Sequence, residues 1–487
     1  MAKSPSHQLP LALSSEKWTN RWWNKLLVLA CNGYFHEHTK QIMILWPMIV
    51  LSSNFLFTNL VSIMFAGHLG KLELAASSLA NSWATVTGFS FMFGLSGALE
   101  TLCSQAYEAR RYTMLAIHLQ TSCIISFFSS TVIAVIWWYS DSILINFFHQ
   151  DRDIAKEAGV FLKFLIPGLF AYGVLQNVLR FLRAQSILES IVGLPWASFV
   201  IHICIIPYAL VHWIGLGFKG ASLATSISIW ISLLMMGLYV FFSNRCNHIV
   251  WDGFSFEPFH HILTYLKLAL PSAAIVCLEY CAFEILVLLA GLMPNPETTT
   301  SIIAMSVNTQ AIVHFIFSGA CVATSTRVAN ELGAGNPDRV KHVVSVTLVK
   351  SIIVGLAIWL TLFYYHIAWA GLFSDRAEII NKFASMTPLL LISNIFDISQ
   401  GILSGVARGL GWQRCAMCIN LGTLYFIGMP IACLIAFKFN LQTQGLWIGL
   451  ICALGCQASG SLLLTLLTRW KKVEGSTNSN RETELLA

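Results

Sequence analysis

Charged residues are scarce in this chain of 487 residues: Asp, Glu, Lys and Arg make up 11% of it, whereas hydrophobic residues make up 56%. A soluble globular protein carries about 25% charged residues. A chain with so few cannot cover a surface that faces water. The composition therefore excludes a soluble fold and indicates lipid as the solvent for most of the protein.

Motifs that would indicate hydrolysis, metal binding or nucleic-acid binding are also lacking. The chain has no GxxxxGK[ST] sequence, so ATP hydrolysis is not expected to drive its activity. Most of its 13 cysteines, such as Cys123 and Cys452, lie in apolar segments without metal-ligand spacing, and we interpret them as small buried hydrophobic residues. No loop is a dense basic run, so the net charge of +6 does not indicate a nucleic-acid partner. We expect no enzyme, no metal and no cofactor.

Long apolar stretches are what the chain has in abundance. A membrane-spanning helix needs about 20 mainly apolar residues. Stretches of this kind lie at 42–66, 75–99, 114–139, 157–179, 190–214, 219–243, 263–292, 300–325, 342–366, 380–403, 415–437 and 444–467. The sequence therefore predicts an all-α integral membrane protein with twelve transmembrane helices.

An internal repeat divides these helices into two halves of six. Pro47 recurs as Pro271 and Gly220 recurs as Gly445, at nearly the same offset along the chain. Because six is an even number, equivalent helices cross the membrane in the same direction, and the two lobes are related by a pseudo-two-fold axis along the membrane normal. Such folds place the substrate and coupling-ion sites between the lobes, near the bilayer midplane. The expected segments are an N-terminal tail (1–40), an N-lobe (41–243), a linker (244–262), a C-lobe (263–468) and a C-terminal tail (469–487).

Lysine and arginine are distributed unevenly over the expected loops. With twelve spans both tails lie on one side of the membrane, and that side collects most of the basic residues, including Arg110, Arg111, Arg408 and Arg414. Basic loops face the cytoplasm. We therefore expect both termini to be cytoplasmic. We also expect a multi-pass monomer in the lipid bilayer, in either the plasma membrane or the vacuolar membrane.

Four acidic residues within or at the ends of the predicted helices need an explanation, because a charge at the centre of a membrane costs about 2.5–3.5 kcal/mol. They are Glu100, Glu279, Glu284 and Asp397. One explanation is structural, such as pairing with an arginine, and it suits Glu100 best because a basic pair follows that residue in the sequence. The other explanation is a functional site.

Helix geometry separates the two glutamates and groups the aspartate with other polar residues. At about 100° per residue, Glu279 and Glu284 point about 140° apart, so only one of them is expected to face the cleft of a straight helix. Asp397 lies in a polar stripe with Asn394, Gln400 and Ser404, at spacings of three and four residues. A stripe of this kind needs water, a ligand or polar neighbours beside it.

Coupling to a cation is the functional interpretation of these carboxylates. Desolvation disfavours the charged form of a carboxyl group, so such a group can take up a proton on the acidic side of a membrane and release it on the other side. Loss of the charge lets the neighbouring helices repack. We expect Glu279, Asp397 and Glu284 to take part in coupling, with H+ favoured over Na+.

Polar and aromatic residues are expected to line the cleft around a small organic substrate. Packing between helices is the alternative role for the amides among them. The candidates are Asn54, Asn59, Glu100, Asn177, Tyr280, Phe283, Asn308 and Gln400.

Three long motifs resemble the signatures of the plant-type MATE (multidrug and toxic compound extrusion) transporters. Residues 98–107 (ALETLCSQAY) are similar to the second-helix signature, 325–337 (STRVANELGAGNP) to the eighth and 401–413 (GILSGVARGLGWQ) to the tenth. The resemblance implies a two-lobed, V-shaped antiporter that exports organic solutes in exchange for protons or sodium. It also implies that Glu279 and Asp397 carry the coupling.

The chain departs from the family pattern at a few positions, and a different function stays open. Tyr280 and Cys281 stand where two tryptophans are frequent, and Asn59 stands where glutamine is frequent, so the substrate is not implied. A flippase for lipid-linked substrates with a similar architecture is the alternative. It usually needs several cationic side chains in the central cavity, whereas Arg180 and Arg183 are expected at the cytoplasmic end of the fourth helix.

Overall fold

The computed structural model describes residues 57–148, 150–185, 187–243, 256–371 and 377–467, together with Val50 and Asn54. Every regular element in these ranges is helical. The two predicted tails and most of the predicted linker lie outside them. The described end of the linker contains one short helix, α11 (Glu257–His260).

Eleven helices within the described ranges are long and apolar enough to cross a membrane. A shorter apolar helix, Phe57–Leu69, lies within the first predicted span, whose earlier part falls mostly outside the described residues. A helix thus overlaps each of the twelve predicted stretches, and the prediction of an all-α membrane protein is confirmed.

The N-lobe contains the segments before the linker, and two of its spans include π-helical turns. They are α2 (Lys71–Ala84), η1 (Thr85–Phe89), α3 (Ser90–Leu95), α4 (Gly97–Glu108), α5 (Tyr112–Trp138), α6 (Ser140–Asn146), α7 (Arg152–Ala184), α8 (Leu188–Cys204), α9 (Ile206–Tyr208), η2 (Ala209–Trp213) and α10 (Phe218–Phe242). The second predicted span, 75–99, is therefore not one regular helix but a series of segments within Leu72–Glu108.

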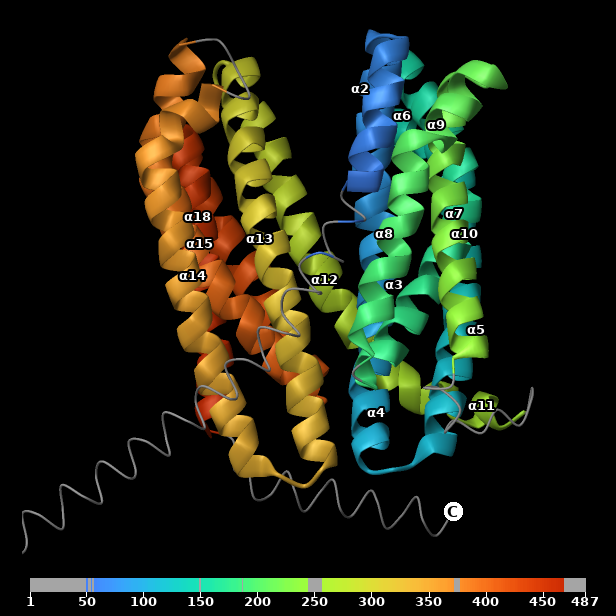
Figure 1. Cartoon of the computed structure of the whole chain (residues 1–487). Helices are drawn as coiled ribbons and strands as arrows, with labels where there is room; N and C mark the ends of the chain where they lie inside the picture. Colours follow the sequence, from blue (N-terminus) through green and yellow to red (C-terminus); the bar gives the residue numbers. More distant parts are fainter. Residues whose placement is uncertain are drawn as a thin grey trace, which may run out of the picture.

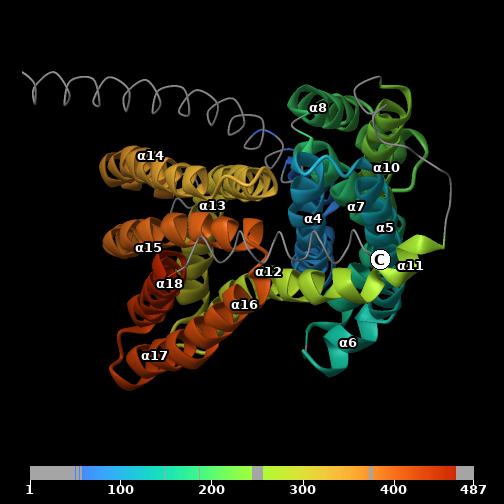
Figure 2. The same ribbon diagram turned by 90° about the horizontal axis from the view of Figure 1, so that it is seen from below.

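The C-lobe contains the segments after the linker. They are α12 (Ile262–Gly291), α13 (Pro296–Gly333), α14 (Pro337–Gly371), α15 (Ala377–Gly409), α16 (Gln413–Leu421), η4 (Gly422–Gly428), α17 (Met429–Cys433), η5 (Leu434–Lys438) and α18 (Gln442–Leu467). In Figure 1 the N-lobe helices α2 to α10 and the C-lobe helices α13 to α18 form two groups, and α12 leans from the second towards the first. Figure 2, seen from below, shows α16 beside α12, which extends from the C-lobe helices to the N-lobe helices.

Several helices extend beyond their predicted ends. The eighth span was predicted at 300–325, whereas α13 continues to Gly333. The predicted boundary stopped before the first charged residue, but a helix can carry charges once it leaves the hydrocarbon core. Arg327 and Glu331, one turn apart in this extension, form an ion pair of 3.5 Å.

The repeat is visible in the packing of two glycines. A Cβ atom built on Gly220 of α10 would lie 2.9 Å from the carbonyl carbon of Leu210, and one built on Gly445 of α18 would lie 2.8 Å from that of Ile435. Leu210 and Ile435 are equivalent positions of the repeat, because the offset between them is the one that separates the two glycines. In both lobes, a glycine thus lets the last helix approach the backbone of the preceding segment.

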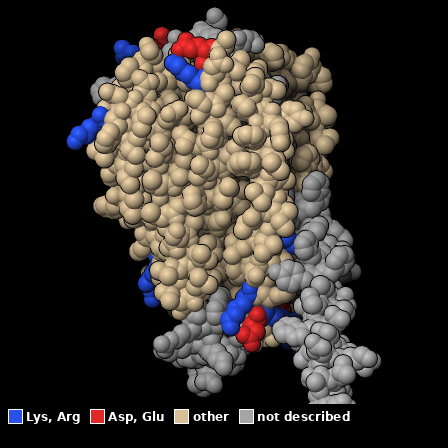
Figure 3. Space-filling model, turned by 90° about the vertical axis from the view of Figure 1, so that its left-hand side faces the viewer, with Lys and Arg blue, Asp and Glu red and all other residues tan. Residues whose placement is uncertain are grey.

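The outer surface has the character expected of a membrane protein. Figure 3 shows a broad belt without Lys, Arg, Asp or Glu, and these residues gather at its two edges. Large apolar side chains are exposed on the outward faces, for example Phe127 and Phe128 on α5 and Leu360 on α14. In water such a surface would favour aggregation, whereas lipid solvates it.

Hydrogen bonds between the lobes gather at one end of the bundle, which we call the closed end and which contains loops 109–111, 334–336 and 410–412. The hydroxyl of Thr101 on α4 donates to the carbonyl of Arg408 on α15 over 2.8 Å. The side-chain amide of Gln105 donates to the carbonyl of Gly409 over 3.4 Å. The second-helix motif therefore packs directly against the tenth-helix motif.

Candidate functional site

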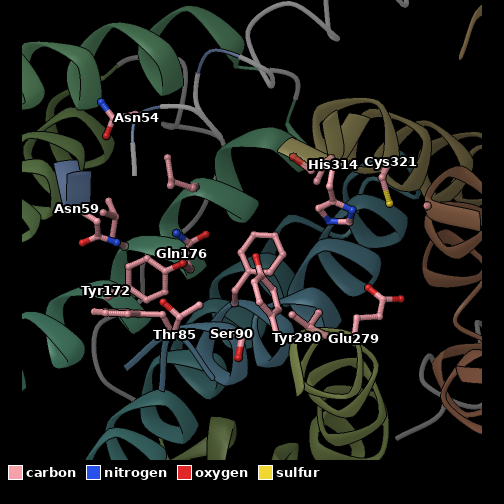
Figure 4. A pocket seen from close by; sticks show the side chains of 18 of the residues that line it. Asn54, Asn59, Thr85, Ser90, Tyr172, Gln176, Glu279, Tyr280, His314 and Cys321 are labelled. Atoms are coloured by element: carbon pink, nitrogen blue, oxygen red, sulfur yellow. The ribbon is translucent and has the colours of Figure 1, made fainter. Parts of the chain in front are cut away.

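A cavity of about 350 Å³ lies between the two lobes and is lined by residues of both. Figure 4 shows the amides Asn54, Asn59 and Gln176 on one side of it and Glu279 and His314 on the other. Aromatic and aliphatic side chains make up much of the remaining wall, including Phe89, Phe93, Tyr172, Leu175, Phe199, Ile275, Tyr280 and Phe317. The cavity therefore combines an apolar wall with a few polar groups, as is typical of sites for small organic molecules.

Glu279 reaches the cavity from α12 and is held by three amide side chains. Its Oε1 atom accepts hydrogen bonds from Gln400 Nε2 at 2.9 Å, Asn420 Nδ2 at 2.8 Å and Gln457 Nε2 at 3.3 Å. These donors come from α15, α16 and α18, so the position of the carboxylate depends on the packing of four helices of the C-lobe.

Asp397 reaches the same cavity from α15 and contacts two residues of α13. Its Oδ2 atom accepts a hydrogen bond from Gln310 Nε2 at 3.0 Å and lies 3.4 Å from His314 Nδ1. Gln310 is fixed in turn, because its Oε1 atom accepts a hydrogen bond of 3.1 Å from the hydroxyl of Ser393. The aspartate thus belongs to a polar network that joins α13 to α15.

The structure brings several of the predicted site residues to this cavity. Glu279 and Asp397 both line it, although they belong to helices that are far apart in the sequence. Of the predicted substrate-contacting residues, Asn54, Asn59, Tyr280 and Gln400 line it.

Other predicted cavity residues lie elsewhere. Asn177 is 1% exposed and donates a hydrogen bond of 2.8 Å to Ser126 on α5, because the 100° step along α7 turns it away from Gln176, which faces the cavity. Phe283 packs against the core of the C-lobe, and Asn308 is exposed. Glu284, predicted for coupling, is half-buried on α12 outside the cavity lining.

Glu100 faces an arginine rather than the cavity. It is 1% exposed, and its Oε2 atom forms an ion pair with Nη1 of Arg180 on α7. Its other oxygen, Oε1, accepts a hydrogen bond of 3.1 Å from the hydroxyl of Thr326 on α13. The structural explanation of Glu100 is thus the one that the geometry shows, and the acid also joins the two lobes near the closed end.

Three basic residues that were not predicted at the site line the cavity: His314, Arg183 and Arg408. Arg408 had been expected at the membrane surface but is only 8% exposed, and its Nη2 atom contacts the sulfur of Cys321. Arg408 follows Ser404 by one helical turn and so continues the polar stripe of α15, which is the signal that could have placed it.

Among the residues that the structure describes, no group of three or more His, Cys, Asp or Glu side chains could hold a metal ion. The polar groups that line the cavity are two carboxylates, two guanidinium groups, one imidazole, one thiol, two phenols, several amides and several hydroxyls.

Comparison with known families relates this site to transporters. Residues 47–208 and 271–434 each match the family model described as MatE. The first match begins at Pro47 and the second at Pro271, the same two prolines that mark the internal repeat.

Curated relatives match over nearly the whole chain. Protein DETOXIFICATION 18 of Arabidopsis thaliana is 50% identical over 441 residues, which cover 91% of this chain and 93% of the relative. Protein DETOXIFICATION 16 of the same plant is 42% identical over 445 residues, which cover 91% of each chain.

Solved structures match the fold. The crystal structure of the eukaryotic MATE transporter AtDTX14 is similar with a TM-score of 0.87 at 38% identity, over 92% of this chain and 99% of that one. The outward-facing structure of a multidrug resistance MATE family transporter of the MOP superfamily has a TM-score of 0.79 over 89% of this chain and 96% of that one. At 17% identity, the second likeness concerns the fold alone.

Proposed function

This chain belongs to the MATE family of multi-pass membrane transporters, and from that premise we propose that it exports small organic solutes in exchange for protons. The observation that carries the proposal is that Glu279 and Asp397, from α12 and α15, line one cavity between the lobes. Carboxyl groups in such surroundings can bind and release protons while the protein alternates between two conformations.

The surroundings of Glu279 favour a proton over a sodium ion. A hard cation needs several oxygen ligands, as seen in calcium and magnesium sites. Here Gln400, Asn420 and Gln457 all present N–H groups to the same carboxylate oxygen. A sodium ion beside this oxygen would meet N–H groups in place of the oxygen ligands that it needs.

The arrangement of charge supports an orientation with the closed end in the cytoplasm. Arg110, Lys341 and Arg414 are exposed near this end, and loops rich in basic residues face the cytoplasm. In this orientation both termini are cytoplasmic, and the contacts between Thr101 and Arg408 help to separate the cavity from the cytoplasm. We propose a monomer in the plasma membrane or the vacuolar membrane.

A flippase for lipid-linked substrates is the second candidate. Such a protein is expected to have several cationic side chains in its central cavity, and two, Arg183 and Arg408, line the cavity here. The same cavity also contains the carboxylates of Glu279 and Asp397, however, and membership of the MATE family favours the export of solutes.

Transport in sealed proteoliposomes tests the proposal. We expect a pH gradient, acidic on the side opposite the closed end, to drive organic solutes towards that side, and we expect a protonophore to stop this movement. A panel of aromatic solutes with a fluorescent lipid-linked sugar as comparison separates the two candidates. Solute movement that is indifferent to the pH gradient, or acceleration of the lipid-linked sugar alone, would contradict proton-coupled export.

A further inference from the structure

Two arginines of the cavity have donor groups without a hydrogen-bond acceptor among the described residues. Arg183 on α7 is 5% exposed, and its Nε and Nη1 atoms are buried without a hydrogen-bond partner in the described part of the chain. Nε of Arg408 is in the same situation. Both residues line the cavity between the lobes.

Arg180, one turn earlier on α7, differs from Arg183 because all three of its guanidinium nitrogens have partners. Its Nε donates to the hydroxyl of Ser96 at 2.6 Å, its Nη2 donates to the carbonyl of Phe93 at 3.0 Å, and its Nη1 pairs with Glu100. Arg180 therefore occupies the carboxylate that could otherwise have served Arg183.

Arg183 is consequently a buried cation in excess. Its charge interacts with those of Arg180, Arg408 and Glu100, and Arg408 also interacts with Glu279, so three positive groups stand against two carboxylates. Burial of a charge is costly unless a partner of opposite sign compensates for it. An anion that enters the cavity would supply that partner, and the planar fork of the guanidinium suits a carboxylate or a similar oxyanion.

We infer that Arg183, assisted by Arg408, binds the acidic group of an organic anion, which makes acidic aromatic solutes a substrate class of this transporter. The inference rests on the proposed transport function and extends it. Gln176 lies two turns before Arg183 on the same face of α7, about 10 Å along the helix axis. Phe89, Phe93 and Tyr172 line the same cavity, so a flat apolar body has a surface to pack against.

A structural role for Arg183 would have different consequences. If Arg183 served only to stabilise Glu100, its replacement would lower the stability of the protein and leave its choice of ligand unchanged. If it binds an anion, its replacement changes the affinity for acids and leaves the affinity for uncharged analogues unchanged.

The test uses the full-length protein in lipid nanodiscs and two probes that share one ring system, 2-naphthoate and its uncharged amide 2-naphthamide. At pH 7.5 the carboxyl group of the first is ionised. Isothermal titration calorimetry gives both dissociation constants. We expect the wild-type protein to bind 2-naphthoate about tenfold or more tightly than 2-naphthamide, as one charge-assisted hydrogen-bonded pair would provide.

Three variants complete the measurement. R183Q is expected to reduce the affinity for 2-naphthoate to that for 2-naphthamide, and R183K to retain part of the difference, because lysine keeps the charge but not the planar fork. R152Q makes the same change at the exposed start of α7 and is expected to behave as the wild type.

Equal affinity of the wild-type protein for both probes, failure of 2-naphthoate to bind it, or full discrimination by R183Q would each overturn the inference. If R183Q does not fold, the wild-type comparison and R183K decide. Calorimetry uses no pH gradient, so a failure of proton coupling leaves this result intact. Absence of discrimination in a protein that still exports other solutes with protons would overturn the anion site alone.

Discussion

Gln400 donates a hydrogen bond of 2.9 Å from α15 to Glu279 on α12, and it lies one turn beyond Asp397 on the same helix. The two carboxylates of the cavity are thereby linked through one helix: a movement of α15 that repositions Asp397 also moves a donor of Glu279. This arrangement gives a physical route by which protonation of one acid alters the surroundings of the other.

The first prediction is that Glu279→Gln or Asp397→Asn lowers the rate of transport driven by a pH gradient by about tenfold or more. Both variants should still give folded protein in the membrane. The amide copies the shape and polarity of a protonated carboxyl group but cannot release a proton. Uptake into proteoliposomes measures transport, and thermal unfolding measures folding.

Glu284→Gln is the matched control, because it makes the same change on α12 outside the cavity lining. We expect it to retain pH-driven transport. Full pH dependence in both cavity variants, or its loss in Glu284→Gln, would mean that the coupling acids are wrongly assigned.

Much of the fold could be predicted because its determinants are local in the sequence. The apolar stretches locate the helices, and the recurrence of Gly220 as Gly445 reveals the repeat. The π-helical turn at Thr85–Phe89 could not be predicted in this way. Such a turn depends on how the helix packs against its neighbours rather than on the apolar pattern of the sequence.

The site was predictable where a charge stood inside an apolar helix, as for Asp397. Arginines near helix ends were interpreted as surface residues, although α7 and α15 bring Arg183 and Arg408 to the cavity. Helical spacing could have corrected this, because Tyr172, Gln176 and Arg183 lie at intervals of four and seven residues on one face. Pairing of Glu100 with an arginine was expected, but from the basic pair that follows it in the sequence; the actual partner, Arg180, could not be foreseen, since it depends on the packing of α4 against α7.

The second prediction concerns the contact between Thr326 and Glu100. Thr326→Val removes the hydrogen-bond donor and keeps the shape of the side chain. The ratio of molecules with the closed end shut to molecules with it open should therefore fall about three- to tenfold. Single-molecule fluorescence between dyes placed at Arg110 and Lys341, both exposed near this end, measures the distribution of distances.

Thr324→Val provides the comparison, because the hydroxyl of Thr324 donates to the carbonyl of Ala320 within its own helix. It should leave the distance distribution unchanged. An identical distribution for Thr326→Val and the wild type would show that this hydrogen bond does not help to hold the lobes together.

The third prediction fixes the orientation in the membrane. A cysteine placed at Arg414 should react with a membrane-impermeant maleimide from the cytoplasmic side. One placed at Arg152 should react from the opposite side, because α7 begins at Arg152 far from the closed end and runs towards that end. The background for these variants replaces the cysteines that are exposed in the described part of the chain, Cys204, Cys415, Cys418 and Cys456, together with Cys31 and Cys246, which lie outside it. Labelling of the Arg414 position in intact cells would reverse the orientation.

The last prediction tests the repeat through its glycines. In Gly220→Ala and in Gly445→Ala, the new methyl group would meet the backbone of Leu210 or Ile435 at less than 3 Å. Backbone atoms cannot move aside as a flexible side chain does, so each variant should lose about 1–3 kcal/mol of stability. Gly237→Ala, on the same helix as Gly220, finds no atom within 4 Å and should be neutral or slightly stabilising.

Thermal unfolding in detergent ranks the three variants. The losses should add in the double variant, because the two glycines lie in different lobes and share no contact atom. A large loss for one glycine with none for the other would show that the two lobes do not use the same packing.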